Sequence, residues 1–289
     1  MQKPSLWKLI TVSGVILLLT GCVPKPSGGT DSVASLQKMV SIGNKPRARQ
    51  LTNIRRLAIQ ETALSLGAQS GLAWRAKQVN DAVKTNERKL DLVFNFNSML
   101  LEHNVIPPVL VEARNTLNIS DENALRISDR VYTIEKQARF VTTPPNWREY
   151  LSLNYENPAR PDDSLLPKNL EERKIWNEFV AKGWKQGIEQ ANNIFSDNLA
   201  RLKRDYKGMA LYRNLLAQNM VSPPFVAKTD LGITGGGADM RVNDTVLRIT
   251  ALPGLQSDSK KWKPALSLEP AADIALDDKF IVNKSEHEE

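Results

Sequence analysis

The sequence predicts an α+β fold, in which long helices pack on small antiparallel β-hairpins. Two long stretches carry apolar residues at helical spacing. Each is followed by a diproline and then by a short stretch rich in β-branched residues. With 41% hydrophobic residues in 289, the chain has enough apolar material for one such domain, which we place at residues 51–260.

The first long helix is expected over residues 51–84. Its middle, residues 63–73, is crowded with glycine, alanine and serine. A glycine inside a helix costs about 1 kcal/mol relative to alanine. Such crowding indicates either that another backbone passes close by or that the helix breaks near residues 67–71; we favour close packing.

A second helix is expected at residues 90–102, because a helix rarely continues to the residue before a proline and Pro107 follows. Residues 121–125 predict a short turn or helix. Residues 126–142 predict β structure with a tight turn at Ser128 and Asp129. A polar connector, residues 157–168, ends this half.

The second half begins with a long helix predicted over residues 170–207, interrupted at Gly183 and Gly187. A shorter helix is expected at 209–220, and a glycine loop at 235–237. A hairpin is expected at 240–250, turning at Asn243 and Asp244.

The order of elements repeats, with half-repeats at about residues 60–145 and 170–255. Leu100, Asn104 and Arg126 match residues 115 positions later, and the two diprolines are 116 apart. Either the unit is duplicated or the match is coincidence, since the matched types are common in turns and cores. A duplicated unit predicts that the two hairpins pair into one sheet. Under both readings Asp129 and Asp244 are turn formers rather than catalysts.

The N-terminal segment, residues 1–21, has the features of a lipoprotein signal peptide. Lys3 and Lys8 precede an apolar run that is too short to cross a bilayer. Small residues, ending in Gly21, then lead to Cys22, the only cysteine, so we expect cleavage between them and acylation of Cys22. The alternatives are an uncleaved anchor or an ordinary cleaved signal. No other cofactor is expected.

The residue after the cysteine is Val23 rather than aspartate, which favours the outer membrane over the inner one. Residues 22–50 are expected to form a flexible tether rich in proline and glycine. A basic stretch without acidic residues, 38–56, indicates either binding to an anionic leaflet or an acidic partner, or a solvated helix face and arm. Residues 261–289 are expected to form an acidic, disordered tail. An exported location argues against direct nucleic-acid binding.

The chain lacks the residue sets of most enzymes, and we expect no catalytic activity and no metal. The two histidines, His103 and His287, cannot supply a multi-histidine metal site within the domain, and His103 has no flanking triad motif. Gly235 to Gly237 lack the lysine of a phosphate-binding loop. A glycosidase-like carboxylate pair remains as the enzymatic alternative, in a lipoprotein that binds or cleaves peptidoglycan. Its candidates are Glu102, Asp121, Glu122 and Glu135.

Aromatic residues and diprolines suggest docking positions. Trp147 follows Pro144 and Pro145, and aromatic side chains dominate the energetics of protein interfaces. Diprolines are rigid and donate no backbone hydrogen bonds, which suits a fixed docking loop. The candidate partner-binding residues are Pro144, Pro145, Trp147, Pro223 and Pro224.

Ordered blocks along the chain resemble the DotC family of type IVB secretion and conjugation lipoproteins. The matching blocks are ETALSLGAQ at 61–69, GLAWRAK at 71–77, LEHN at 101–104, PP at 107–108, RISDR at 126–130, TTPP at 142–145, VSPP at 221–224, TDLG at 229–232 and LRITALP at 247–253. The similarity covers about residues 51–253 and does not extend with confidence beyond residue 260.

The resemblance implies a non-enzymatic outer-membrane scaffold. Proteins of this kind work with a small DotD-type lipoprotein to bring a DotH-type subunit to the outer membrane, in a ring-like hetero-oligomer. The resemblance does not distinguish whether the complex serves conjugation or the export of effector proteins. The alternatives are the peptidoglycan-binding or peptidoglycan-cleaving lipoprotein and a pilus-associated surface lipoprotein.

Overall fold

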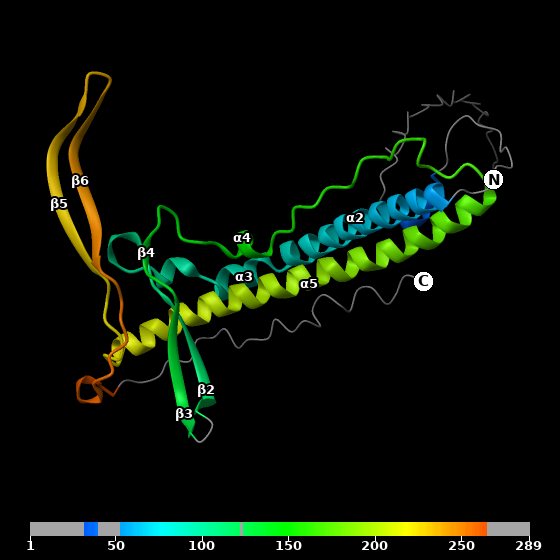
Figure 1. The fold of residues 1–289 in the computed structure, drawn as a ribbon. Coiled ribbons are helices and arrows are strands. Elements are labelled where there is room, and N and C mark those ends of the chain that lie inside the picture. The colour runs from blue at the N-terminus through cyan, green and yellow to red at the C-terminus, as the bar shows by residue number, and fades with distance from the viewer. Residues whose placement is uncertain (1–31, 40–52, 122–123, 265–289) are drawn as a thin grey trace, which may run out of the picture.

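Two long parallel helices form the body of the protein, with β-hairpins at one end (Figure 1). The computed structural model describes residues 32–39, 53–121 and 124–264. Apart from the two long helices and the strands of the two hairpins, every described element has seven residues or fewer. In chain order the elements are α1 Val33–Gln37, α2 Asn53–Thr85, α3 Glu87–Val93, η1 Phe96–Met99, η2 Glu102–Asn104, β1 Val105–Ile106, β2 Val109–Asp121, β3 Ala124–Lys136, β4 Arg139–Phe140, α4 Trp147–Leu151, α5 Leu170–Ala217, β5 Phe225–Gly236, β6 Asp239–Ala251 and η3 Ser259–Lys261. The α+β class predicted from the sequence is confirmed.

Four glycines bring α2 and α5 into backbone contact. A Cβ added to Gly67 would lie 2.4 Å from the Val180 carbonyl oxygen, and one on Gly187 would lie 2.1 Å from the Ala68 carbonyl oxygen. Gly71 and Gly183 are equally tight against the opposite helix. The close backbone approach predicted from the small residues of α2 is therefore confirmed, and the alternative break at residues 67–71 is wrong.

The second long helix is also unbroken, which corrects the interruption predicted at Gly183 and Gly187. Helix α5 runs without a break over 48 residues to Ala217, so most of the separate helix expected at 209–220 is part of it. Close packing of the helix backbones compensates for the low helix propensity of glycine. At about 1.5 Å per residue, α5 is roughly 72 Å long.

The start of the helix pair is held by a buried ion pair. Glu172 is 3% exposed and accepts two hydrogen bonds from Arg55, at 2.6 and 2.8 Å, and one from the Lys168 backbone N–H at 2.8 Å. Arg55 also donates to the Ser164 carbonyl oxygen at 2.9 Å. These contacts join the beginning of α2 to the beginning of α5 and to the connector before it.

The Arg55–Glu172 pair predicts acid-sensitive stability. Burial raises the pKa of Glu172, but the hydrogen bonds from Arg55 and Lys168 outweigh it, so the pKa lies below the usual 4.5. A carboxyl whose pKa is lowered by folding stabilises the fold above its unfolded pKa, and this stabilisation is lost as the pH falls through the folded pKa. We expect Glu172→Gln to cost about 1–3 kcal/mol at pH 7. The difference from the parent should shrink below pH 4.5, as measured by urea unfolding. The exposed neighbour Glu171→Gln is the matched control, and a gap that does not depend on pH would contradict the assignment.

The short helix α1 closes the same end of the body. Leu36 is fully buried against α2 and α5, and its carbonyl oxygen accepts a 2.9 Å hydrogen bond from the indole of the buried Trp176. The predicted signal peptide and the lipidation and cleavage positions Gly21 and Cys22 lie outside the described residues, as do all but residues 32–39 of the predicted tether and all but residues 261–264 of the predicted tail.

The strands form three separate two-stranded sheets, β1–β4, β2–β3 and β5–β6. The expectation that the two hairpins pair into one sheet is wrong. Both turn positions were also misplaced, because Ser128 and Asp129 lie within β3 and Asn243 and Asp244 lie within β6. Asn243 does have the positive φ expected of it, 57°, but at an irregularity where β6 faces Gly232 of β5.

Candidate interaction surface

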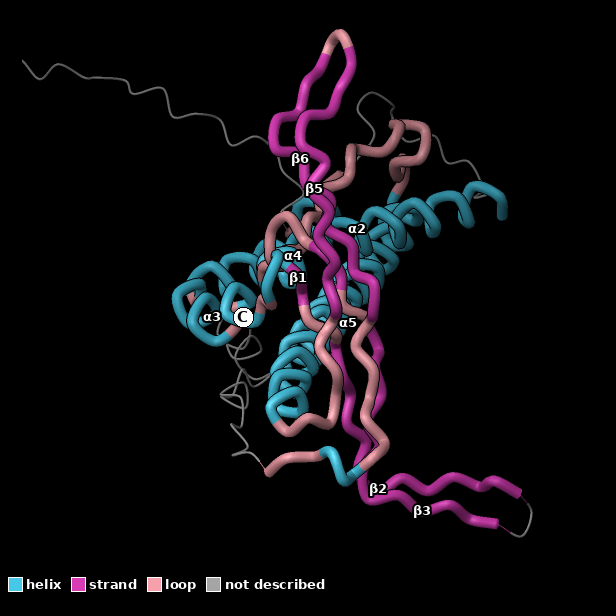
Figure 2. The backbone as a smooth tube through the Cα atoms, turned by 90° about the vertical axis from the view of Figure 1, so that its left-hand side faces the viewer, coloured by secondary structure: helices cyan, strands magenta, loops and turns pink. Residues whose placement is uncertain are grey.

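Two β-hairpins project from the end of the helix pair and are the most exposed parts of the body. We call β2–β3 hairpin A and β5–β6 hairpin B. Figure 1 shows hairpin A extending to one side of α5 and hairpin B to the other, and Figure 2 shows the same divergence after a 90° turn. Each hairpin is a sheet of its own, so its outer half has no neighbouring strand or helix among the described residues.

The base of hairpin A is packed on α5 at a glycine. Val109 and Leu110 are 1% and 2% exposed. A Cβ on Gly208 would lie 2.5 Å from Val109 Cγ1 and 2.7 Å from the Leu110 carbonyl oxygen, so only glycine permits this approach. Leu110 also packs in a cluster with Tyr212 and Leu215. The base of hairpin A is therefore held firmly on α5, whereas its outer half is uncovered.

A buried carboxylate fixes the other strand of hairpin A to the same helix. Asp205 is 2% exposed and accepts hydrogen bonds from Lys136 Nζ at 2.5 Å and from the Tyr150 hydroxyl at 3.0 Å. Burial, followed by the nearby charge of Asp205, raises the pKa of Tyr150, so this hydroxyl remains a hydrogen-bond donor at neutral pH. Asp205 thus connects α5, hairpin A and α4.

We expect Asp205→Asn to destabilise the protein by about 2–3 kcal/mol, because Lys136, 2.5 Å from Oδ2, and Arg204, 3.6 Å from Oδ1, lose their charged partner. Chemical unfolding of the purified protein measures this cost. The exposed Asp197→Asn on the same helix is the control, with an expected change within about 0.5 kcal/mol. Equal stabilities for the two variants would show that Asp205 does not hold the hairpin.

The outer half of hairpin A presents one apolar face. Leu117 lies opposite Ile127, and Ile119 lies opposite Leu125, so these four side chains share a face, which we call tip face A. They are 57–78% exposed. The alternating positions are polar, with Thr116 opposite Ser128 and Asn118 opposite Arg126. The ribbon is therefore amphipathic but has nothing packed on its apolar side.

Hairpin B repeats this pattern. Ile233 lies opposite Val242, and Met240 lies opposite Gly235. Ile233, Met240 and Val242 form tip face B and are 70%, 70% and 59% exposed. On the alternating face Thr234 lies opposite Arg241. Both hairpins thus present a row of aliphatic side chains to solvent.

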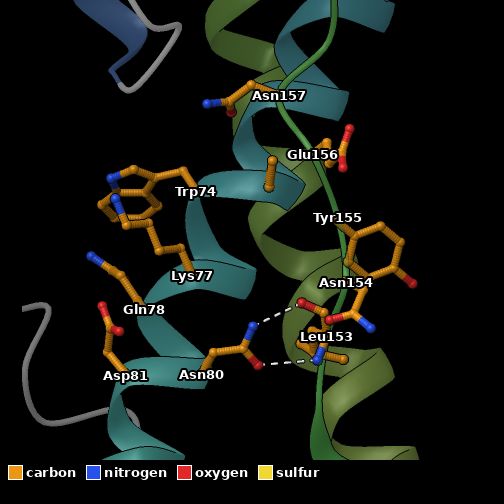
Figure 3. Close-up of a pocket in the computed structure, with 11 residues that line it drawn as sticks. Trp74, Lys77, Gln78, Asn80, Asp81, Leu153, Asn154, Tyr155, Glu156 and Asn157 are labelled. Atoms are coloured by element: carbon orange, nitrogen blue, oxygen red, sulfur yellow. Dashed lines mark hydrogen bonds between the residues drawn. The ribbon is translucent and has the colours of Figure 1, made fainter.

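An open groove runs beside α2, with a volume of about 780 Å³ (Figure 3). The extended segment 153–157 forms one wall. Asn80 holds this wall by donating to the Leu153 carbonyl oxygen at 2.8 Å and accepting from the Leu153 N–H at 3.0 Å. Trp74 on the other wall packs against Trp184, with 5.5 Å between the ring centroids. The lining mixes Lys77 and Asp81 with amides and contains no histidine or cysteine.

Comparison with protein families identifies the relationship. The model of the family described as "Type IV secretory system, conjugal DNA-protein transfer" matches residues 53–264. The chain belongs to this family. The match to the conjugal DNA-protein transfer family begins at the first residue of α2 and includes both hairpins. A search of curated proteins finds no match.

In this conjugal-transfer protein, the predicted docking residues lie in two separate places. Pro144 and Pro145 are half-buried before α4, whereas Pro223 is exposed and Pro224 half-buried at the base of hairpin B. Trp147 is 3% exposed, packs in the core and donates to Asp91 Oδ1 at 2.7 Å. The prediction placed Trp147 at an interface, but in this structure it is a core residue. The missed signal was the capping box of Asn146 and Glu149, which begins α4 and turns the indole inward.

Two of the carboxylates considered for glycan cleavage, Asp121 and Glu135, lie far apart. Asp121 is at the tip of hairpin A, whereas Glu135 is at its base and pairs with Arg204 at 3.2 Å. About a dozen strand residues at roughly 3.3 Å each separate them, far more than the 5–9.5 Å that a glycosidase pair needs. Glu102 lies in η2, and Glu122 is outside the described residues.

Among the residues whose structure is described, no helix is long and apolar enough to cross a membrane. In the same residues, no group of three histidine, cysteine or acidic side chains is placed to hold a metal ion.

Proposed function

We propose that this protein is a lipid-anchored, non-enzymatic scaffold of a type IVB secretion or conjugation core complex, of the DotC type. The observation that carries the proposal is the match to the conjugal-transfer family over the whole helix pair and both hairpins. The ordered blocks from residue 61 to residue 253 support the narrower DotC assignment.

The lipid anchor in this proposal is Cys22, with outer-membrane attachment favoured by Val23. The placement of α1 bears on how such an anchor would hold the body. Cys22 precedes the α1 cap Ser32 by ten residues, which reach at most about 36 Å when extended. Because α1 packs near the start of α2 and α5, an anchor at Cys22 would connect to the body at the end away from the hairpins.

This arrangement suits a scaffold. The body is a stiff rod whose helix α5 is roughly 72 Å long, tethered at one end and bearing exposed apolar ribbons at the other. Exposed apolar patches on a soluble domain mark interaction sites. We propose that a DotD-type lipoprotein and a DotH-type subunit bind the body and are held at the membrane by it.

Affinity purification from the host envelope tests the proposal. The tagged full-length chain, extracted in mild detergent, is expected to bring DotD-type and DotH-type subunits with it, identified by mass spectrometry. A tagged lipoprotein of unrelated function serves as the control. Recovery of the protein without either subunit, from cells that carry out transfer, would contradict the assignment.

A further inference from the structure

Three of the four positions of tip face A correspond to aliphatic residues of tip face B, and the fourth, Ile119, corresponds to Gly235. Leu117 and Ile233 are 116 positions apart, and Leu125 and Ile127 precede Met240 and Val242 by 115. The strands correspond in the same way, since β3 and β6 begin and end 115 residues apart. Their helices also correspond, because Gly67 and Gly71 of α2 lie 116 residues before Gly183 and Gly187 of α5. The same apolar face thus occurs twice in one chain.

Each face is an exposed apolar patch of notable size. At the exposures given above, the aliphatic side chains present on the order of 300–500 Å² on each face, the size of the largest patch on a typical monomer, which is often functional. A lone two-stranded ribbon is also only marginally stable in water and needs a further layer or strand. Both faces therefore call for a covering surface.

One chain cannot cover its own faces. Hairpins A and B leave the end of α5 in opposite directions in both views, and their bases are fixed by buried contacts such as Leu110 and Val221 (Figures 1 and 2). The covering surface must come from another molecule. A lipid bilayer is a poor candidate, because the free edges of a two-stranded ribbon would leave backbone groups without hydrogen bonds in hydrocarbon.

We propose that tip face A of one copy packs on tip face B of a second copy. Both faces are aliphatic: face A has four such side chains, face B has three beside Gly235, and none of these seven side chains is charged. Two ribbons stacked about 10 Å apart form a small four-stranded sandwich. Together with the flanking residues, this buries about 1,000–1,200 Å², at the lower end of specific interfaces and suited to repetition in an assembly.

The contact is heterologous, because each copy offers one face of each kind. A head-to-tail contact of this type propagates and closes into a ring when the rotation between copies allows. The inference rests on the hairpins and not on the lipid anchor or on any other subunit, so it can fail while the proposed function stands.

Site-specific crosslinking in the cell envelope tests the pairing. Cys22 is the only native cysteine, so crosslinks that the native chain does not form must come from the introduced cysteines. A short bis-maleimide is used, because facing sheets are about 10 Å apart and a direct disulfide needs closer Cα atoms. A full-length chain carrying both Leu117→Cys and Ile233→Cys is expected to form a ladder of multimers. The matched control carries Asn118→Cys and Arg241→Cys on the opposite faces and should remain at the level of the native chain.

Co-expression separates this contact from its alternatives. Two differently tagged chains, one with Leu117→Cys and one with Ile233→Cys, should crosslink only to each other, as a 1:1 dimer. Dimers of Leu117→Cys alone would show that like faces pair, which overturns the proposal. So would crosslinks to a different protein, or the absence of any ladder from a double-cysteine chain present at the normal level.

Discussion

Replacing Gly187 with leucine is expected to prevent the helix pair from forming. Even the Cβ would lie 2.1 Å from the Ala68 carbonyl oxygen and 2.7 Å from the Leu72 nitrogen. These are backbone atoms, which cannot move aside without displacing α2. Overpacking of this kind costs about 1–3 kcal/mol for small additions and more for leucine, enough to remove much of the stability of a typical domain.

The variant Gly187→Ala gives a sharper test, because close packing and helix propensity predict opposite changes in stability. In an exposed helix Gly→Ala stabilises by about 1 kcal/mol. Here Gly187→Ala is expected to lower the melting temperature measured by circular dichroism, whereas the exposed neighbour Gln186→Ala should leave it nearly unchanged. A higher melting temperature for Gly187→Ala would mean that the two helices do not touch at this position.

Replacing Cys22 with serine is expected to abolish transfer. Serine cannot form the thioether that carries the first lipid, so the protein would no longer be retained at the membrane. Tethering can strengthen binding to partners at the same membrane by about 10²–10⁴-fold, and we expect transfer frequency to fall by at least about a hundred-fold. Cell fractionation should find the variant in the soluble periplasm.

A substitution in the same segment that retains the cysteine, Pro24→Ser, provides the control for export and expression. It should fractionate with membranes and transfer normally. Transfer at the normal frequency by a soluble Cys22→Ser protein would show that anchoring is dispensable for its role.

The long helices were predictable because their causes are local. Apolar spacing located both, and the small residues between 63 and 73 correctly indicated a neighbouring backbone. The continuity of α5 was missed because its glycines were weighed by helix propensity alone. Packing against α2 supplies the missing stability, and that contact joins residues more than 100 positions apart.

The hairpins were misplaced for a different reason. Asparagine and aspartate favour tight turns, but they also adopt positive φ within irregular strands, as Asn115 and Asn243 do at 51° and 57°. Strand pairing is set by contacts that a single sequence does not show. The sequence does contain a signal for the tip faces, because Leu117 and Ile119, and likewise Met240 and Val242, occupy alternate positions. The predicted turns at 128–129 and 243–244 interrupted the strands that carry these faces.

Of the residues predicted to bind a partner, Trp147 is buried, whereas the four prolines stay a prediction. Trp147 has the composition of an interface anchor, yet its ring packs in the core beside Leu151 and Tyr206. Exposure depends on how the whole chain folds around a residue. The surfaces that are uncovered are instead aliphatic, and they lie on strands that the sequence-based turns had divided.

Mass spectrometry of the N-terminal peptide of the protein, isolated from its host envelope, tests the central claim of a membrane-held scaffold most directly. We expect a chain that begins at Cys22 and carries acyl groups on that residue. A retained leader, or a free thiol at position 22, would contradict it.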